Sequence, residues 1–103
     1  MMGPKRPRSG TMTRDLAEAH GLKALIFLAE DERRLTRFLA ESGLDPDELR
    51  RRAGEPEMLA AVLNHLLEDE SLLLVFAAGA GFDPAEVQSA RAALGGASPW
   101  DST

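Results

Sequence analysis

The sequence predicts an all-α fold, a six-helix bundle made of two tandem three-helix units. The first observation is an internal repeat, since residues 25–48 return as residues 63–86, 38 positions later, with half of the aligned residues identical. The second is that the shared residues are helix caps, helix breakers and apolar core positions. The third is that no segment has the period-two pattern of a strand. The repeat therefore specifies a shape and not a reaction.

Length and composition predict one soluble domain. A chain of 103 residues can build one modest core, and its 44% hydrophobic and 28% charged residues are typical of a globular protein. The absence of cysteine excludes disulfides, thiolate metal sites and cysteine nucleophiles, and fits a reducing compartment. The basic start lacks the apolar stretch of a signal peptide, and no apolar run approaches the ~20 residues that span a bilayer. We expect a cytoplasmic protein with no membrane contact.

The chain divides into three parts. Residues 1–12 are basic and poor in apolar side chains, so a disordered tail is expected there. Residues 13–96 form a single helical domain, with repeat units at about 14–54 and 55–95, and residues 97–103 form a loose C-terminal tail. Without the basic tail, the remainder is more acidic than the net charge of −5 indicates, and this negative charge disfavours nucleic acid as a partner.

The first helix is expected over residues 14–30, with Thr13 as its cap. Its apolar residues form a stripe at the start and spread over nearly the whole circumference toward the end. Gly21 lies in the middle, where glycine weakens a helix by up to ~1 kcal/mol unless a neighbouring helix approaches closely.

The second helix is expected to begin at an Asp31 cap and to end at Gly43 as a left-handed stop. Leu35, Phe38 and Leu39 form its inner face, and three arginines lie largely outside that face. The arginines are Arg33, Arg34 and Arg37.

The segment after Gly43 carries the strongest local signal. Asp45 caps a helix, Pro46 takes the first helical position, and Glu48 can reach back to the N–H of the cap. Leu44 and Leu49 occupy the positions of a hydrophobic staple. The second copy repeats each part at Gly81, Phe82, Asp83, Pro84, Glu86 and Val87.

The remaining helices follow from proline starts and glycine stops. The third helix runs from Pro46 to Ala53, and the fourth opens at Pro56. The fifth begins at residue 69 or 70 and is ended by Gly79 and Gly81, and the sixth runs over about 84–94. The fourth helix has an apolar face at helical spacing, made of Met58, Leu59, Val62, Leu63, Leu66 and Leu67.

The second and fifth helices differ most between the two copies. Three polar positions of the second helix are apolar in the fifth, where they are Leu72, Leu74 and Val75. A helix that is apolar on all sides is either buried on all sides or covered by a partner. The first interpretation makes it the central helix, and the second makes it the patch of a homodimer or another partner. Under both we expect Leu72, Leu73, Val75 and Phe76 to be substantially buried.

No catalytic, cofactor-binding or metal-binding residues stand out. The acidic clusters at residues 30–32 and 68–70 are interpreted as helix caps, and a cation site between them is the alternative. His20 and His65 are expected to be ordinary surface or half-buried residues. The serines have no evident base, and no glycine-rich phosphate loop is present. We therefore expect a protein that is not an enzyme and has no cofactor.

Two groups of arginines suggest a binding surface. They are Arg33, Arg34 and Arg37 on the second helix and Arg50, Arg51 and Arg52 on the third. Nucleic acid or an acidic protein could be recognised there. Interleaved acids offer intrahelical partners, such as Asp47 for Arg51 and Glu48 for Arg52, so a solvated arginine face is favoured.

Three motifs between residues 43 and 77 resemble a small alphaproteobacterial family of all-helical proteins known only as a domain of unknown function. They are the Gly-Leu-Asp-Pro turn, the Ala53-Gly54-x-Pro56 turn and the Asp69-Glu70 pair before an apolar helix. The resemblance extends over roughly residues 16–94. It implies a small intracellular helical protein and supplies no catalytic residues.

The sequence does not indicate a specific function. The leading hypothesis is a small non-enzymatic cytoplasmic protein-interaction module that binds a protein partner or itself as a homodimer. The alternative is an accessory nucleic-acid-binding or regulator-associated protein that uses its arginine-rich helix surfaces.

Overall fold

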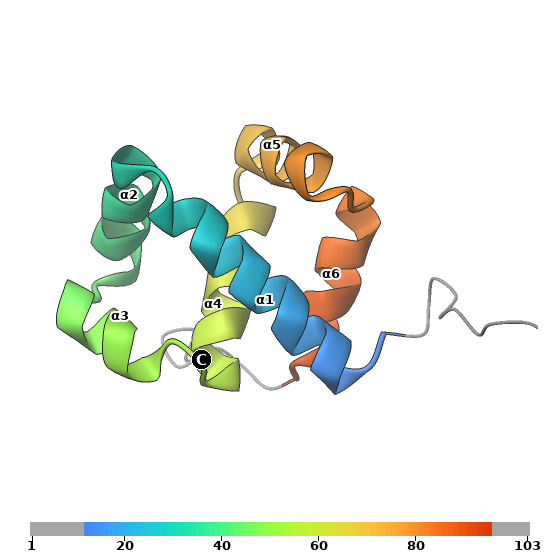
Figure 1. Cartoon of the computed structure of the whole chain (residues 1–103), viewed down its shortest axis with the longest axis horizontal. Coiled ribbons are helices and arrows are strands. Elements are labelled where there is room, and N and C mark those ends of the chain that lie inside the picture. The colour runs from blue at the N-terminus through green and yellow to red at the C-terminus, as the bar shows by residue number, and fades with distance from the viewer. Residues whose placement is uncertain (1–11, 96–103) are drawn as a thin grey trace, which may run out of the picture.

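The computed structural model describes residues 12–95, and within them the chain forms helices and no strand. Figure 1 shows α1 crossing the molecule, with α2 and α3 toward one end and α5 and α6 toward the other. The fold is all-α, as predicted. The helices are α1 (Arg14–Ala29), α2 (Glu32–Ser42), α3 (Pro46–Arg52), α4 (Pro56–Leu67), α5 (Glu70–Ala80) and α6 (Pro84–Ala93).

The core lies where α1, α4 and α6 pack against one another. α2 packs on α1, and α5 packs on α4, α6 and the C-terminal half of α1. Phe38 fixes α2 to α4, because its ring is fully buried and makes an edge-on contact with the ring of His65 at a centroid distance of 5.2 Å.

The central helix of the bundle is α4, so of the two interpretations of the fifth helix, the one that makes it central was wrong. Residues 58–63 of α4 are all buried, together with His65 and Leu66. In α5 only Phe76 and Ala77 are buried. Both helices are apolar enough to be central. α4 is covered because α1, α5 and α6 all pack against it.

The third and sixth helices pack differently, although they have equivalent places in the repeat. α6 packs closely on both α1 and α4. α3 has seven residues, lies at the edge of the molecule in Figure 1, and buries only Leu49. The pairing of two equivalent three-helix units therefore stays a prediction.

The repeated Asp-Pro turns cap helices where the sequence places them. The Asp45 side chain accepts a hydrogen bond from the N–H of Glu48 at 2.8 Å, and the Asp83 side chain accepts one from Ala85 at 2.9 Å. At α6 the carboxylate of Glu86 also accepts from the N–H of Asp83 at 2.9 Å, which completes the capping box. At α3 the Glu48 carboxylate lies 3.8 Å from Arg52 Nη1 instead.

Replacing Asp45 or Asp83 with Ala should lower the free energy of unfolding by about 0.5–2 kcal/mol, because the first turn of α3 or α6 loses an acceptor for its free N–H groups. Chemical denaturation of each variant measures the change. Asp47→Ala is the matched control, since Asp47 stands in the same turn, is exposed, and bonds the Arg50 side chain rather than the backbone. Denaturation midpoints equal to that of the control would contradict the capping role.

Two glycines end helices in the left-handed conformation that the sequence predicts. Gly43 after α2 has φ 78°, and Gly81 after α5 has φ 79°. Gly79, which was expected to help end the fifth helix, lies inside α5. The predicted tails over residues 1–11 and 97–103 lie outside the described residues. Met12 belongs to the body and not to a tail, because it is half-buried against the core.

Candidate interaction surface

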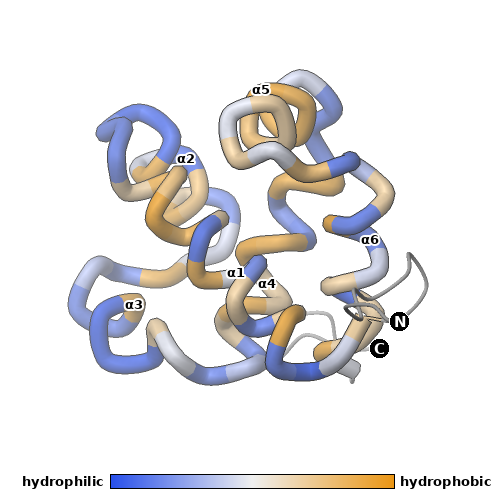
Figure 2. Tube along the Cα trace, turned by 45° about the vertical axis from the view of Figure 1, so that its right-hand side comes forward, coloured by the Kyte–Doolittle hydropathy of each residue, from blue (hydrophilic) through white to orange (hydrophobic). Residues whose placement is uncertain are grey.

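Large apolar side chains are exposed on neighbouring parts of α1 and α5. The exposed fractions are 42% for Leu22, 57% for Ile26, 49% for Leu74 and 53% for Val75. Figure 2 shows α5 as mostly hydrophobic along its length, whereas α3 is mostly hydrophilic. We call these four residues the α1–α5 surface. An exposed apolar cluster on a small protein is typical of an interaction site.

A groove of about 570 Å³ runs between α1 and α5 beside this surface. Of the four residues of the α1–α5 surface, Ile26 and Val75 belong to the walls of this groove. Gly79 contributes no side chain, and the space where its Cβ would lie is open. The full lining is Lys23, Ile26, Phe27 and Glu30 from α1, Arg34 from α2, and Val75, Phe76, Gly79 and Ala80 from α5.

Aromatic contacts hold the walls of the groove in place. The Phe27 and Phe76 rings lie 5.3 Å apart between centroids and connect α1 to α5. The guanidinium of Arg34 lies 3.9 Å from the centroid of Phe27, and its Nη1 donates to the Phe27 carbonyl oxygen at 3.1 Å. The groove is therefore largely preformed, which lowers the entropy lost when a partner binds.

The sequence indicated only part of this surface. Leu74 and Val75 were candidate interaction residues, and the structure exposes both, so the expectation that Val75 is substantially buried was wrong. Leu72 and Leu73 are half-buried, and Phe76 is buried. Sequence analysis missed Leu22 and Ile26, although the spread of apolar residues around the first helix was a usable signal.

Both histidines are buried, which corrects the expectation of ordinary surface or half-buried residues. His20 is 7% exposed, stacks on Phe82 at a centroid distance of 4.1 Å, and its Nδ1 lies 2.9 Å from the Leu16 carbonyl oxygen. His65 is 8% exposed and packs edge-on against Phe38. The His20 ring joins α1 to the turn between α5 and α6, and the His65 ring joins α4 to α2.

A polar hollow of about 480 Å³ lies beside His65, where α2 and α4 end and α5 begins. His65 Nδ1 lies 3.2 Å from Glu41 Oε1, and Arg37 lies 3.1 Å from the other oxygen of Glu41 and 3.9 Å from Asp69. Glu68 and Glu70 also line the hollow. The contacts of Glu41 with His65 and of Arg37 with Asp69 connect α2 to α4 and to the cap of α5, and this role is structural.

The acidic clusters at residues 30–32 and 68–70 each supply a helix cap. Asp69 accepts from the N–H of Leu72 at 3.1 Å. The N–H groups of Arg34 and Arg33 donate to the Asp31 carboxylate and hold its pKa below the usual value. Such a carboxylate stabilises the folded state above its ordinary pKa, and this contribution is lost as the pH falls through the lowered pKa.

Residues 12–95 contain neither a metal-binding cluster nor a membrane-spanning helix. In that part of the chain, no three histidine, aspartate or glutamate side chains are grouped so that they could hold a metal ion. The same residues contain no helix that is both long and apolar enough to cross a bilayer.

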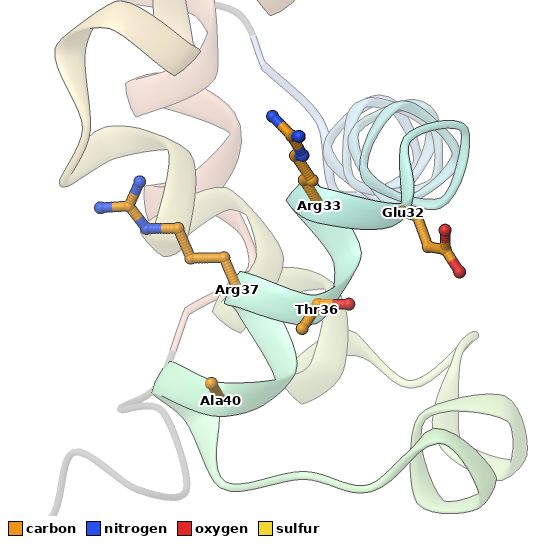
Figure 3. Close-up of a pocket in the computed structure, with 5 residues that line it drawn as sticks. All are labelled: Glu32, Arg33, Thr36, Arg37 and Ala40. Carbon is orange, nitrogen blue, oxygen red and sulfur yellow. The ribbon is translucent and has the colours of Figure 1, made fainter.

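The α2 arginines do not form a closed site. Arg33 and Arg37 extend from α2 to one side and Glu32 to the other, around a shallow hollow that α2 alone lines (Figure 3). Arg34 is removed from this face because it stacks on Phe27. A hollow made by one helix surface cannot enclose a ligand.

Carboxylates accompany most of the remaining arginines. Arg52 Nε lies 2.9 Å from Glu55, and Arg50 lies 3.2 Å from Asp47, which was expected to pair with Arg51 instead. The arginines of α2 and α3 therefore stand among acids rather than in a continuous basic face. The partners are Glu41 and Asp69 for Arg37, Asp47 for Arg50, and Glu48, Glu55 and Glu57 for Arg52.

Comparison with known proteins gives one match. A family described as "Protein of unknown function (DUF3572)" matches residues 14–97, a range that includes helices α1 to α6. No curated protein and no solved structure matches the chain. The chain belongs to the DUF3572 family, a family of proteins of unknown function.

Proposed function

We propose that this chain is a small non-enzymatic protein-interaction module of the cytoplasm, and that it binds an apolar helix of a partner at the α1–α5 surface. The observation that carries the proposal is the exposure of Ile26 and Val75 in the walls of a preformed groove, with Leu22 and Leu74 also exposed on the same two helices. Exposed apolar side chains of this size are typical of a surface that is buried against a partner.

The shape of the groove favours a helix as the bound element. Two helices form its walls. The α5 wall contains the small residues Gly79 and Ala80, so the axis of a third helix can come close to α5 there. Recognition of an apolar helix face in a groove between helices is a common mode of protein binding. The partner is either another protein or a second copy of this chain.

Nucleic-acid binding by the arginines of α2 and α3 has less support. The carboxylates beside Arg37, Arg50 and Arg52 offset the positive charge that phosphate contacts require. Arg34 is engaged with Phe27. The α1–α5 surface has no comparable obstacle to protein binding.

Site-specific photo-crosslinking in the native cell tests the proposal. A benzophenone side chain at position 26 should give a discrete adduct with a peptide from an apolar helix, identified by mass spectrometry, because this position lies at the groove. The adduct should be lost when Val75→Lys is added, since a charged side chain at the wall disfavours burial against a partner.

The matched control carries the same benzophenone at position 88, an exposed site on α6. Any adduct formed at position 88 should persist when Val75→Lys is added. An unreactive position 26, or a yield there equal to that at position 88, would contradict the proposed function.

A further inference from the structure

We infer that the helix bound at the α1–α5 surface is α1 of a second copy of this chain. The two α1 helices would cross antiparallel beside Ile26, with Lys23 of each protomer opposite Glu30 of the other. The inference rests on the proposed function and adds the identity of the partner. Three observations carry it: the apolar stripe on α1, the two charges along its edge, and the open space above Gly79.

α1 has a second apolar face that points to solvent. Ala19, Leu22, Ile26 and Ala29 are exposed and recur at intervals of three and four residues, which places them on one side of the helix. The opposite side is buried in the core, as the positions of Ala17, Ala24 and Leu28 show. A stripe with this spacing is the type of surface that packs against another helix.

Lys23 and Glu30 lie on the edge of this stripe that faces the groove. They are seven residues apart, which is about two helical turns, and both line the groove. Within residues 12–95 neither has a salt-bridge partner. Lys23 only approaches the Phe82 ring, at 5.8 Å from its centroid. Both charges are available to a second chain.

The charge pattern is complementary to itself. A twofold axis perpendicular to two antiparallel helices brings the same edge of each helix together. When that axis passes beside residues 26 and 27, Lys23 of one protomer faces Glu30 of the other, and symmetry repeats the pair. A surface that complements itself closes into a dimer and leaves no binding site unfilled. An unrelated partner would need its own negative charge opposite Lys23 and its own positive charge opposite Glu30.

Gly79 leaves room for the second α1 helix. A Cβ at this position would meet nothing within 4 Å, so packing inside one chain does not require glycine there. Glycine weakens a helix interior, and its presence at an open wall permits the close approach of another backbone. Val75 stands one turn earlier on the same wall and would contact the arriving helix.

Charge reversal tests the dimer and its geometry. Sedimentation velocity over a concentration series should show that the full chain dimerises. Lys23→Glu and Glu30→Lys should each raise the dissociation constant about tenfold or more, because both symmetric pairs become repulsive. The double variant should return to within about threefold of the wild type. An equimolar mixture of the two single variants should form heterodimers, detected by native mass spectrometry, because both of its pairs are attractive.

Two controls separate charge geometry from folding and net charge. Arg51→Glu changes the net charge by the same amount as Lys23→Glu at an exposed position on α3, and it should dimerise like the wild type. Ile26→Lys should be monomeric, and its melting temperature should equal that of the wild type at low protein concentration, where the wild-type dimer has dissociated. A dimer in which the single and double variants dissociate alike would overturn the antiparallel arrangement.

The crosslinking result separates the two proposals. If the wild type stays monomeric at high micromolar concentration while position 26 crosslinks to a different protein, the dimer is overturned and the proposed function stands. If position 26 gives no adduct and the chain is monomeric, both are overturned. An adduct between position 26 and α1 of a second copy supports both.

Discussion

Replacing Leu63 with Ala should lower the free energy of unfolding by about 2–5 kcal/mol. Leu63 is fully buried in the middle of α4, where α1 and α6 also pack. The change removes buried methyl groups and leaves a cavity that the surrounding helices can fill only in part. Urea denaturation followed by circular dichroism measures the loss.

Leu74→Ala is the matched control for this prediction. It deletes the same atoms from α5, but Leu74 is 49% exposed, so the loss should be about 1 kcal/mol or less. Both measurements belong at low protein concentration, where self-association does not contribute to stability. A larger loss at Leu74 than at Leu63 would mean that α5, and not α4, is the central helix.

Replacing Gly21 with Ala should destabilise the protein by about 1–3 kcal/mol, although Ala is the better helix former. A Cβ at position 21 would lie 2.7 Å from the Cβ of Leu59. The contacted atom is next to the α4 backbone and cannot move without shifting the helix. The close crossing of α1 and α4 therefore requires glycine at this position.

Gly79→Ala should have the opposite effect and stabilise the protein by about 0.5–1 kcal/mol. Gly79 is also inside a helix, but a Cβ there meets open space. Chemical denaturation of both variants compares two glycines with the same intrinsic propensity and different surroundings. If Gly21→Ala were as stabilising as Gly79→Ala, α1 and α4 would not approach closely at position 21.

Helix boundaries could be predicted from the sequence because they depend on residues three or four positions apart. A cap such as Asp45 bonds a backbone group within its own turn, and Gly43 and Gly81 reach the left-handed conformation through their lack of a side chain. The sequence offered a close approach of a neighbouring helix at Gly21 as one alternative. It did not identify Leu59 as the residue that lies there.

The choice of central helix could not be made from the sequence. Helices α4 and α5 are both rich in leucine. Composition determines how much apolar surface each helix presents, but it does not determine which neighbouring helices bury that surface. α1, α5 and α6 all pack on α4 and bury it, whereas Leu74 and Val75 lie on the part of α5 that its neighbours α1, α4 and α6 leave exposed. The same long-range packing buries His20 against Phe82 and His65 against Phe38.

By itself, the sequence determined that this protein is all-α and where its helices begin and end, because caps, prolines and glycines act within one turn. Only the tertiary structure decided which apolar faces remain open. The first helix is apolar on two sides, and its own residues do not distinguish the side that meets α4 and α6 from the side that carries Ile26. Packing between segments distant in the chain makes that distinction, and it places Ile26 and Val75 together at the surface proposed for binding.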